Sequence, residues 1–90
     1  MLRYITAIRL SGGNGLEHIT DYKWEEPETR RSSSSARSAM VEWVRAPGNN
    51  AYVRANTGDV RVTVVNANPP YLRTEPNALK QDNLLSLPRF

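Results

Sequence analysis

A tyrosine and an arginine stand two residues apart at two places in the chain, at Tyr52 and Arg54 and again at Tyr71 and Arg73. Arginine carries a permanent charge on a planar fork that suits phosphate, and a tyrosine ring can stack on a nucleobase. Residues two apart on a β-strand point to the same side of the sheet. If both pairs lie on strands, the spacing predicts a surface that binds a phosphate-bearing ligand.

The segments that carry these residues have the composition of short β-strands. Residues 60–65, "VRVTVV", are strongly β-branched, and residues 51–54 and 71–74 are bounded by turn residues. If the valines of 60–65 face the core, the residues between them face away. The predicted ligand-binding residues on this outward face are Tyr52, Arg54, Arg61, Tyr71 and Arg73, which Arg3 and Arg9 of an N-terminal strand would extend.

Three other interpretations remain open for the same surface. Tyrosine and arginine are common on solvated antiparallel strands, where cross-strand pairs stabilise by about 0.2–1 kcal/mol. They are also enriched in protein interfaces, so the chain could be an interaction or inhibitor domain that binds a host protein and no nucleotide. An unpaired strand edge would allow a homodimer. The phosphate-binding hypothesis differs from all three, because the affinity for a nucleotide or short nucleic acid should fall steeply as salt is added.

Composition limits the class of protein. The chain has 90 residues, no cysteine and a formal net charge of +3, and 10 of its 12 basic residues are arginine. This length predicts one small domain, residues 1–90, that folds without disulfides. Arg3 and Arg9 interrupt the apolar N-terminal stretch, and no run approaches the roughly 20 apolar residues of a membrane span, so we expect a cytoplasmic protein without membrane contact.

The order of the segments predicts an α+β fold. Residues 2–10 alternate, with Tyr4 and Ile8 on one side and Arg3 and Ile5 on the other, and residues 17–24 form the second strand of a hairpin. The polar residues 25–35 are expected to be a mobile loop. We therefore predict a mostly antiparallel sheet of four or five short strands.

One amphipathic helix is predicted over Ala36–Arg45, packed on one face of that sheet. Its apolar residues recur at three and four, the serines before it could cap its first turn, and Pro47 and Gly48 end it. Near the C-terminus, Asp82 is expected to cap a short turn whose leucines seal the open edge of the core.

Catalysis, a metal and a cofactor are not expected. A nucleophilic triad would have to be built around His18, the chain's one histidine, and the chain has no cysteine nucleophile. No other residue pattern supports such a triad. The carboxylates Glu25, Glu26 and Glu28 crowd one polar segment, which is typical of a solvated charge run. The glycines of "SGGNG", residues 11–15, precede a strand where a phosphate loop would precede a helix.

Several pieces of the chain together resemble a known family. They are "AIRLSGG", "EHIT", "YKW", "MVEWV", "AYV" and, above all, "YLRT" followed by "DNLLSLP". They are similar to the small bacterial and phage proteins grouped as a domain of unknown function, DUF3892. The resemblance implies a compact stand-alone domain and no particular activity. Because that family occurs on phage and prophage genomes, it also implies a phage origin, and a phage protein of this size could sequester a nucleotide in the host cytoplasm.

Overall fold

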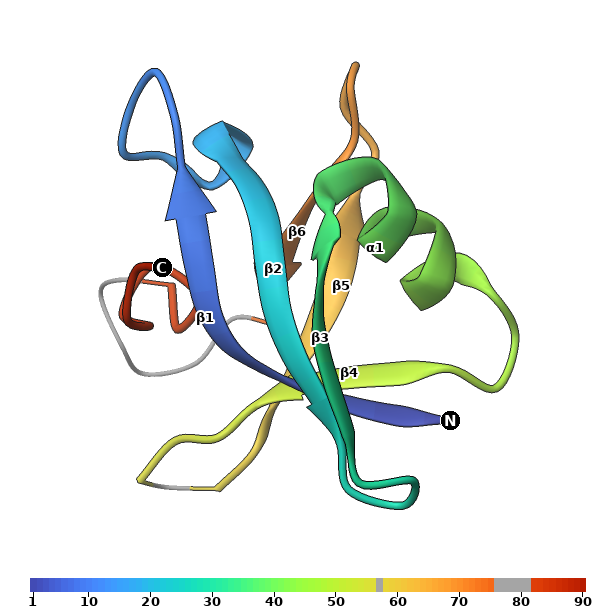
Figure 1. The fold of residues 1–90 in the computed structure, drawn as a ribbon. Coiled ribbons are helices and arrows are strands. Elements are labelled where there is room, and N and C mark those ends of the chain that lie inside the picture. The colour runs from blue at the N-terminus through green and yellow to red at the C-terminus, as the bar shows by residue number, and fades with distance from the viewer. Residues whose placement is uncertain (57, 76–81) are drawn as a thin grey trace.

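The computed structural model describes residues 1–56, 58–75 and 82–90, and over these residues it shows one six-stranded sheet with one α-helix (Figure 1). The elements are β1 (Leu2–Leu10), the short 3-10 helix η1 (Leu16–His18), β2 (Ile19–Glu26), β3 (Arg31–Ala36), α1 (Arg37–Arg45), β4 (Asn50–Val53), β5 (Val60–Val65) and β6 (Tyr71–Thr74). The predicted α+β class is confirmed, with six strands in place of four or five. None of the described helices is long and apolar enough to cross a membrane.

The strands are arranged in the order β3-β2-β1-β4-β5-β6. Every neighbouring pair is antiparallel except β1 and β4, which are parallel. A parallel pair needs a crossover connection, and here β2, β3 and α1 provide it. The chain therefore builds one half of the sheet, crosses over through the helix and adds the other half on the far side of β1.

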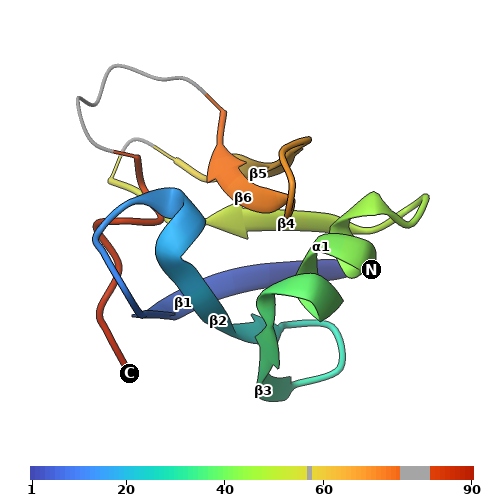
Figure 2. The same ribbon diagram turned by 90° about the horizontal axis from the view of Figure 1, so that it is seen from above.

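The sheet is strongly curved, and α1 lies between its two ends (Figure 2). The helix contacts β2 and β3 on one side and β5 and β6 on the other. Met40 and Val41 of α1 are buried in the core, and Trp43 and Val44 pack against it. As predicted, the apolar side of the helix covers the inner face of the sheet.

The C-terminal residues cover the free edge of β6 and close the core beside it. Asp82 accepts hydrogen bonds from the backbone N–H of Thr74 (3.0 Å) and of Leu84 (2.9 Å), so it caps both the free edge of β6 and its own turn. Leu84 is fully buried, and Leu85 and Leu87 pack against the core. The predicted sealing role of this segment is confirmed. The residues between the two family-related motifs "YLRT" and "DNLLSLP" that lie outside the described part of the chain are 76–81.

The serine-rich segment is a strand, so the prediction of a loop over residues 25–35 was wrong. Residues 31–36 form β3, which pairs with β2 along its whole length, and β2 itself continues to Glu26. The indole N–H of Trp24 donates to the Ser35 hydroxyl at 2.9 Å. The sequence of β3 shows no apolar alternation, because this edge strand buries almost no side chains. Its backbone hydrogen bonds to β2 stabilise it instead.

Two local predictions also need correction. The helix begins at Arg37, and no side chain caps its N-terminus, because the preceding serines belong to β3. The segment before β2 forms η1, so His18 lies in a 3-10 turn and not on a strand. There its imidazole accepts a hydrogen bond from the Gly15 N–H at 3.1 Å, which agrees with a structural role for His18.

The predicted alternation of β1 fails at a bulge. Ile5 is paired with Trp24 and Ala7 with Lys23, so Thr6 is an extra residue on β1. A bulge reverses the faces of all residues beyond it. Ile5 and Ile8 are consequently both buried, although strict alternation puts them on opposite sides.

Arg3 points inward as well, and the core encloses it. Its guanidinium lies 3.6 Å from the ring centroid of Trp24 and 4.2 Å from that of Trp43. Its Nε donates to Oε2 of Glu26 at 2.9 Å, and its Nη1 lies 3.6 Å from Sδ of Met40. The side chain of Arg3 is 13% exposed and that of Glu26 is 4% exposed. We call these residues the Arg3 cage; they hold a cation where it is largely shielded from water.

Candidate functional site

The candidate site is the outer face of β4, β5 and β6, where strand alternation presents polar side chains. The inward residues of these strands, among them Val53, Val62 and Leu72, are buried in the core. Their neighbours Tyr52, Arg61 and others therefore face the opposite side. This confirms the predicted orientation of the valines of β5 and of both Tyr-x-Arg pairs.

The register brings four of the five predicted residues together on three adjacent strands. Tyr52 is directly opposite Arg61 on the β4–β5 pair, and Thr63 is directly opposite Arg73 on the β5–β6 pair. Arg61 and Arg73 are therefore diagonal neighbours, about 7–8 Å apart in such a ladder, which is within reach of long side chains. Tyr71 lies two residues before Arg73, on the same side of β6. We call Arg61 and Arg73 the arginine pair.

Arg54, the fifth predicted residue, belongs to a separate cluster. Its guanidinium forms an ion pair with Glu25 and lies 3.9 Å from the ring centroid of Tyr4. Tyr4 and Tyr52 are partners on the parallel β1–β4 pair, with ring centroids 6.4 Å apart. The hydroxyl of Tyr4 donates to Oδ2 of Asp59 at 2.7 Å. This Tyr4 cluster continues the outer face across β1 to β2.

Electrostatics separates the Tyr4 cluster from the arginine pair. In the cluster, the carboxylates of Glu25 and Asp59 outnumber the one cation, Arg54. The hydrogen bond to Asp59 is the main cause that raises the pKa of Tyr4. A negative surrounding of this kind repels phosphate. Arg54 is thus the weakest of the predicted ligand-binding residues, because Glu25 already neutralises it.

The arginine pair is held by neutral groups instead. Nη2 of Arg61 donates to Oδ1 of Asn50 at 2.8 Å, and Nε of Arg73 donates to the backbone oxygen of Thr74 at 3.3 Å. Among the described residues, neither guanidinium has a carboxylate within ion-pair distance. Each keeps its full charge and most of its five N–H donors. Both residues are exposed, so a ligand in solution can reach these donors.

Arg3 and Arg9 do not extend this face. The Arg3 cage lies on the opposite side of the sheet, among buried residues. Arg9 is exposed on the second half of β1, where its Nε donates to the backbone oxygen of Phe90 at 3.1 Å and its guanidinium lies 4.6 Å from the Phe90 ring centroid. The expectation that the first strand contributes arginines to the site was therefore wrong. Arg3 is on the same side of β1 as the buried Ile5, and Arg9 lies beyond the part of β1 that pairs with β4 and is held by Phe90.

The sequence did not single out three residues that shape the site. Asn50 orients Arg61, and Thr63 of β5 is directly opposite Arg73. The exposed Glu75 follows β6, and its backbone N–H donates to the oxygen of Arg61 at 2.8 Å, so this carboxylate residue is the neighbour of Arg61 in the continued β5–β6 register. Strand register alone determines these neighbours, and no spacing in one segment could reveal a register between segments.

The residues that were weighed for other chemistry are dispersed. Glu26 belongs to the Arg3 cage and Glu25 to the Tyr4 cluster, so they lie on opposite sides of β2. In the described part of the chain, no group of three or more histidine, cysteine or acidic side chains is arranged to hold a metal ion. The arginine pair therefore remains the candidate for binding an anion on the outer face of the sheet.

Comparison with known proteins identifies a family and no activity. Residues 4–88 match the family described as "Protein of unknown function (DUF3892)". This match spans nearly the whole chain and confirms the resemblance drawn from the closing motif. No match was found among curated proteins or among solved structures.

Proposed function

Since this chain belongs to the DUF3892 family of proteins of unknown function, its role has to be inferred from its own residues, and we propose that it is a non-catalytic binding protein for a phosphate-bearing ligand. The ligand is a nucleotide or a short nucleic acid, held on the outer face of β4, β5 and β6. On this proposal the protein acts in the cytoplasm and, if it is phage-encoded, sequesters the ligand inside the host.

The observation that carries the proposal is an arginine pair without ion-pair partners, flanked by two tyrosines. Arg61 and Arg73 are diagonal neighbours with no carboxylate within ion-pair distance among the described residues. Tyr52 is directly opposite Arg61, and Tyr71 lies two residues from Arg73 on β6. Two guanidinium groups at this separation can share one phosphate or hold two consecutive ones. A flat aromatic ring beside them offers a stacking surface for a base, which binds without a deep pocket.

Thermal unfolding with a panel of ligands tests this proposal. The panel contains nucleoside monophosphates, nucleoside triphosphates, cyclic dinucleotides and a short single-stranded oligonucleotide, each at low and at high salt. A ligand that binds only the folded state at 100 times its dissociation constant adds about 2.7 kcal/mol of stability, which is visible as a higher melting temperature. Added salt should reduce the effect strongly, because phosphate contacts release counterions.

Matched charge variants show whether the arginine pair is the site. Arg61→Gln and Arg73→Gln each remove one positive charge, and Arg30→Gln removes one from the exposed β2–β3 turn, away from this face. The proposal predicts that the first two variants lose the ligand-induced shift and the third retains it. Equal losses in all three would indicate non-specific attraction. No shift with any ligand would favour the alternative, an interaction domain without a nucleotide ligand.

A further inference from the structure

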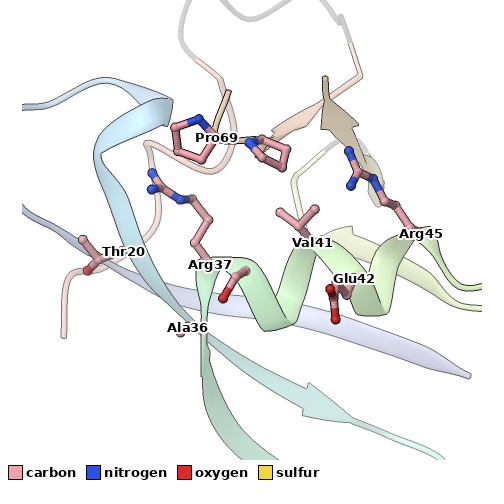
Figure 3. A pocket seen from close by; sticks show the side chains of 9 residues that line it. Thr20, Ala36, Arg37, Val41, Glu42, Arg45 and Pro69 are labelled. Carbon is pink, nitrogen blue, oxygen red and sulfur yellow. The ribbon is translucent and has the colours of Figure 1, made fainter. Parts of the chain in front are cut away.

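A groove of about 360 Å³ separates α1 from the turn between β5 and β6, away from the outer sheet face (Figure 3). One wall is a single side of α1, with Arg37, Val41 and Arg45 at intervals of four residues. The other wall is formed by Pro69 and Pro70. Its volume lies at the lower end of the range for ligand sites, and its centre is apolar.

A cation stands at each end of this groove. Figure 3 shows Arg37 and Arg45 extending from the helix toward the side of Pro69, with Val41 between them. Glu42 also lines the groove, and its side chain points away from Pro69 in this view. The guanidinium of Arg37 donates to the backbone oxygen of Glu17, and that of Arg45 donates to Oδ1 of Asn66 at 2.9 Å. Neither has an ion-pair partner among the described residues. The groove is therefore apolar in the middle and positive at both ends.

The spacing of these three side chains matches one kind of ligand. In an α-helix, positions four residues apart rise about 6 Å along the axis, so Arg37 and Arg45 are about 12 Å apart along it. In an extended peptide, alternate residues lie about 6.6 Å apart and point to the same side, so the first and fifth residues span about 13 Å. An extended segment thus presents three side chains in the register of Arg37, Val41 and Arg45.

We propose that this groove binds an extended acidic peptide segment of a partner protein with the pattern acid-x-apolar-x-acid. The two carboxylates pair with Arg37 and Arg45, and the central apolar side chain packs between Val41 and the two prolines. Both arginines are already oriented by hydrogen bonds to neutral groups, so little side-chain entropy is lost when the carboxylates bind. This proposal concerns a different surface from the phosphate site and does not depend on it.

Fluorescence anisotropy with synthetic peptides tests the spacing without altering the protein. The probe is a fluorescein-labelled Gly-Glu-Ser-Leu-Ser-Glu-Gly peptide. The controls are the rearranged Gly-Glu-Glu-Ser-Leu-Ser-Gly, which has the same composition and charge, and a peptide with lysine in place of both glutamates. We expect the probe to bind about tenfold more tightly than the rearranged peptide, since that one reaches only one arginine with its leucine in place. Equal binding of the two, or no binding of the probe, would overturn the proposal.

Variants locate the peptide on the protein. Arg37→Gln and Arg45→Gln keep a side-chain N–H donor and remove a charge, and each should weaken binding of the probe about tenfold. Arg30→Gln, in the exposed β2–β3 turn outside both surfaces, should leave probe binding unchanged. A circular dichroism melt checks that each variant is folded. If Arg30→Gln weakens the probe as much as the groove variants do, the peptide is attracted by net charge alone and the groove is not its site.

Discussion

Arg3 and Arg61 lie on opposite faces of the same sheet, and their surroundings differ in charge, exposure and packing. Arg3 is enclosed between two tryptophan rings and paired with a buried carboxylate, Glu26. Arg61 is exposed, bonded to the neutral Asn50, and next to a second free cation, Arg73. The first arrangement neutralises the guanidinium and covers it with two aromatic rings, and the second leaves a charged group exposed with one hydrogen bond to a neutral side chain.

This difference explains why the arginine content of a chain says little about ligand binding. A buried arginine that is paired with a buried carboxylate stabilises the fold, because removing either partner leaves an unpaired charge in the core. An exposed arginine held by one neutral acceptor adds little stability and can accept a ligand. The Tyr4 cluster is intermediate, since Arg54 is exposed and yet neutralised by Glu25.

The largest effect is expected from Arg3→Met, which leaves Glu26 buried without its partner. Loss of one member of a buried ion pair costs about 3–5 kcal/mol, a large part of the stability of a small domain. Urea unfolding at neutral pH measures this cost. A loss below about 1 kcal/mol would contradict the structural role of the Arg3 cage. The double variant Arg3→Met, Glu26→Leu should recover much of the loss, because it removes both charges from the core.

Because of the Arg3 cage, the free energy of unfolding should fall at acidic pH. The hydrogen bond from Arg3 is the main cause that lowers the pKa of Glu26 below its ordinary value of 4.5. A lowered pKa in the folded state gives a stabilisation that is complete above the unfolded-state pKa and is lost as the pH falls through the folded-state pKa. Urea unfolding between neutral pH and pH 3 should therefore show a steeper decline for the natural protein than for Glu26→Gln. Parallel curves would contradict the assignment.

A smaller effect is expected at Arg54, which is exposed like Arg61 but paired with a carboxylate like Arg3. Because Glu25 neutralises this arginine, Arg54→Gln should lower stability by at most about 1 kcal/mol and weaken phosphate binding less than Arg73→Gln does. Glu25→Gln should strengthen phosphate binding, since it frees Arg54 and removes a negative charge. Titration calorimetry with the nucleotide found in the thermal screen compares these three variants. If Arg54→Gln proves the most damaging of them, the site is centred on the Tyr4 cluster.

The smallest effect on stability is expected from the arginine pair. Arg61→Gln and Arg73→Gln remove exposed side chains without an ion-pair partner among the described residues, so each should change the free energy of unfolding by no more than about 0.5 kcal/mol. The urea measurements used for Arg3→Met provide the comparison. A loss of several kcal/mol would mean that these arginines stabilise the fold as Arg3 does. The proposed difference between the inner and the outer face of the sheet would then be wrong.

Local patterns predicted much of the fold. The alternation in "VRVTVV" and "YLRT" correctly assigned the inward residues Val62 and Leu72 and the outward Arg61 and Arg73. The three- and four-residue spacing gave the helix to within one residue of its start. These features were predictable because they depend on burial within one segment.

The remaining features depend on contacts between segments. The bulge at Thr6 reversed the faces of β1, and no composition signal marks it. The serines of β3 form a strand only because β2 offers a backbone ladder beside them. The diagonal of Arg61 and Arg73, and the pairing of Arg54 with Glu25, follow from register between strands. One sequence specifies the residues of the candidate site, but it does not show which of them are already paired.

The side-chain Nε–H signals of the arginines, followed by nuclear magnetic resonance during a nucleotide titration, test the central claim most directly. The account predicts that the signals of Arg61 and Arg73 shift first and together, that Arg54 responds weakly, and that Arg3 does not respond, because its donor is bound to Glu26. Shifts confined to other arginines, or none at a concentration that raises the melting temperature, would show that the uncompensated arginine pair is not the binding site.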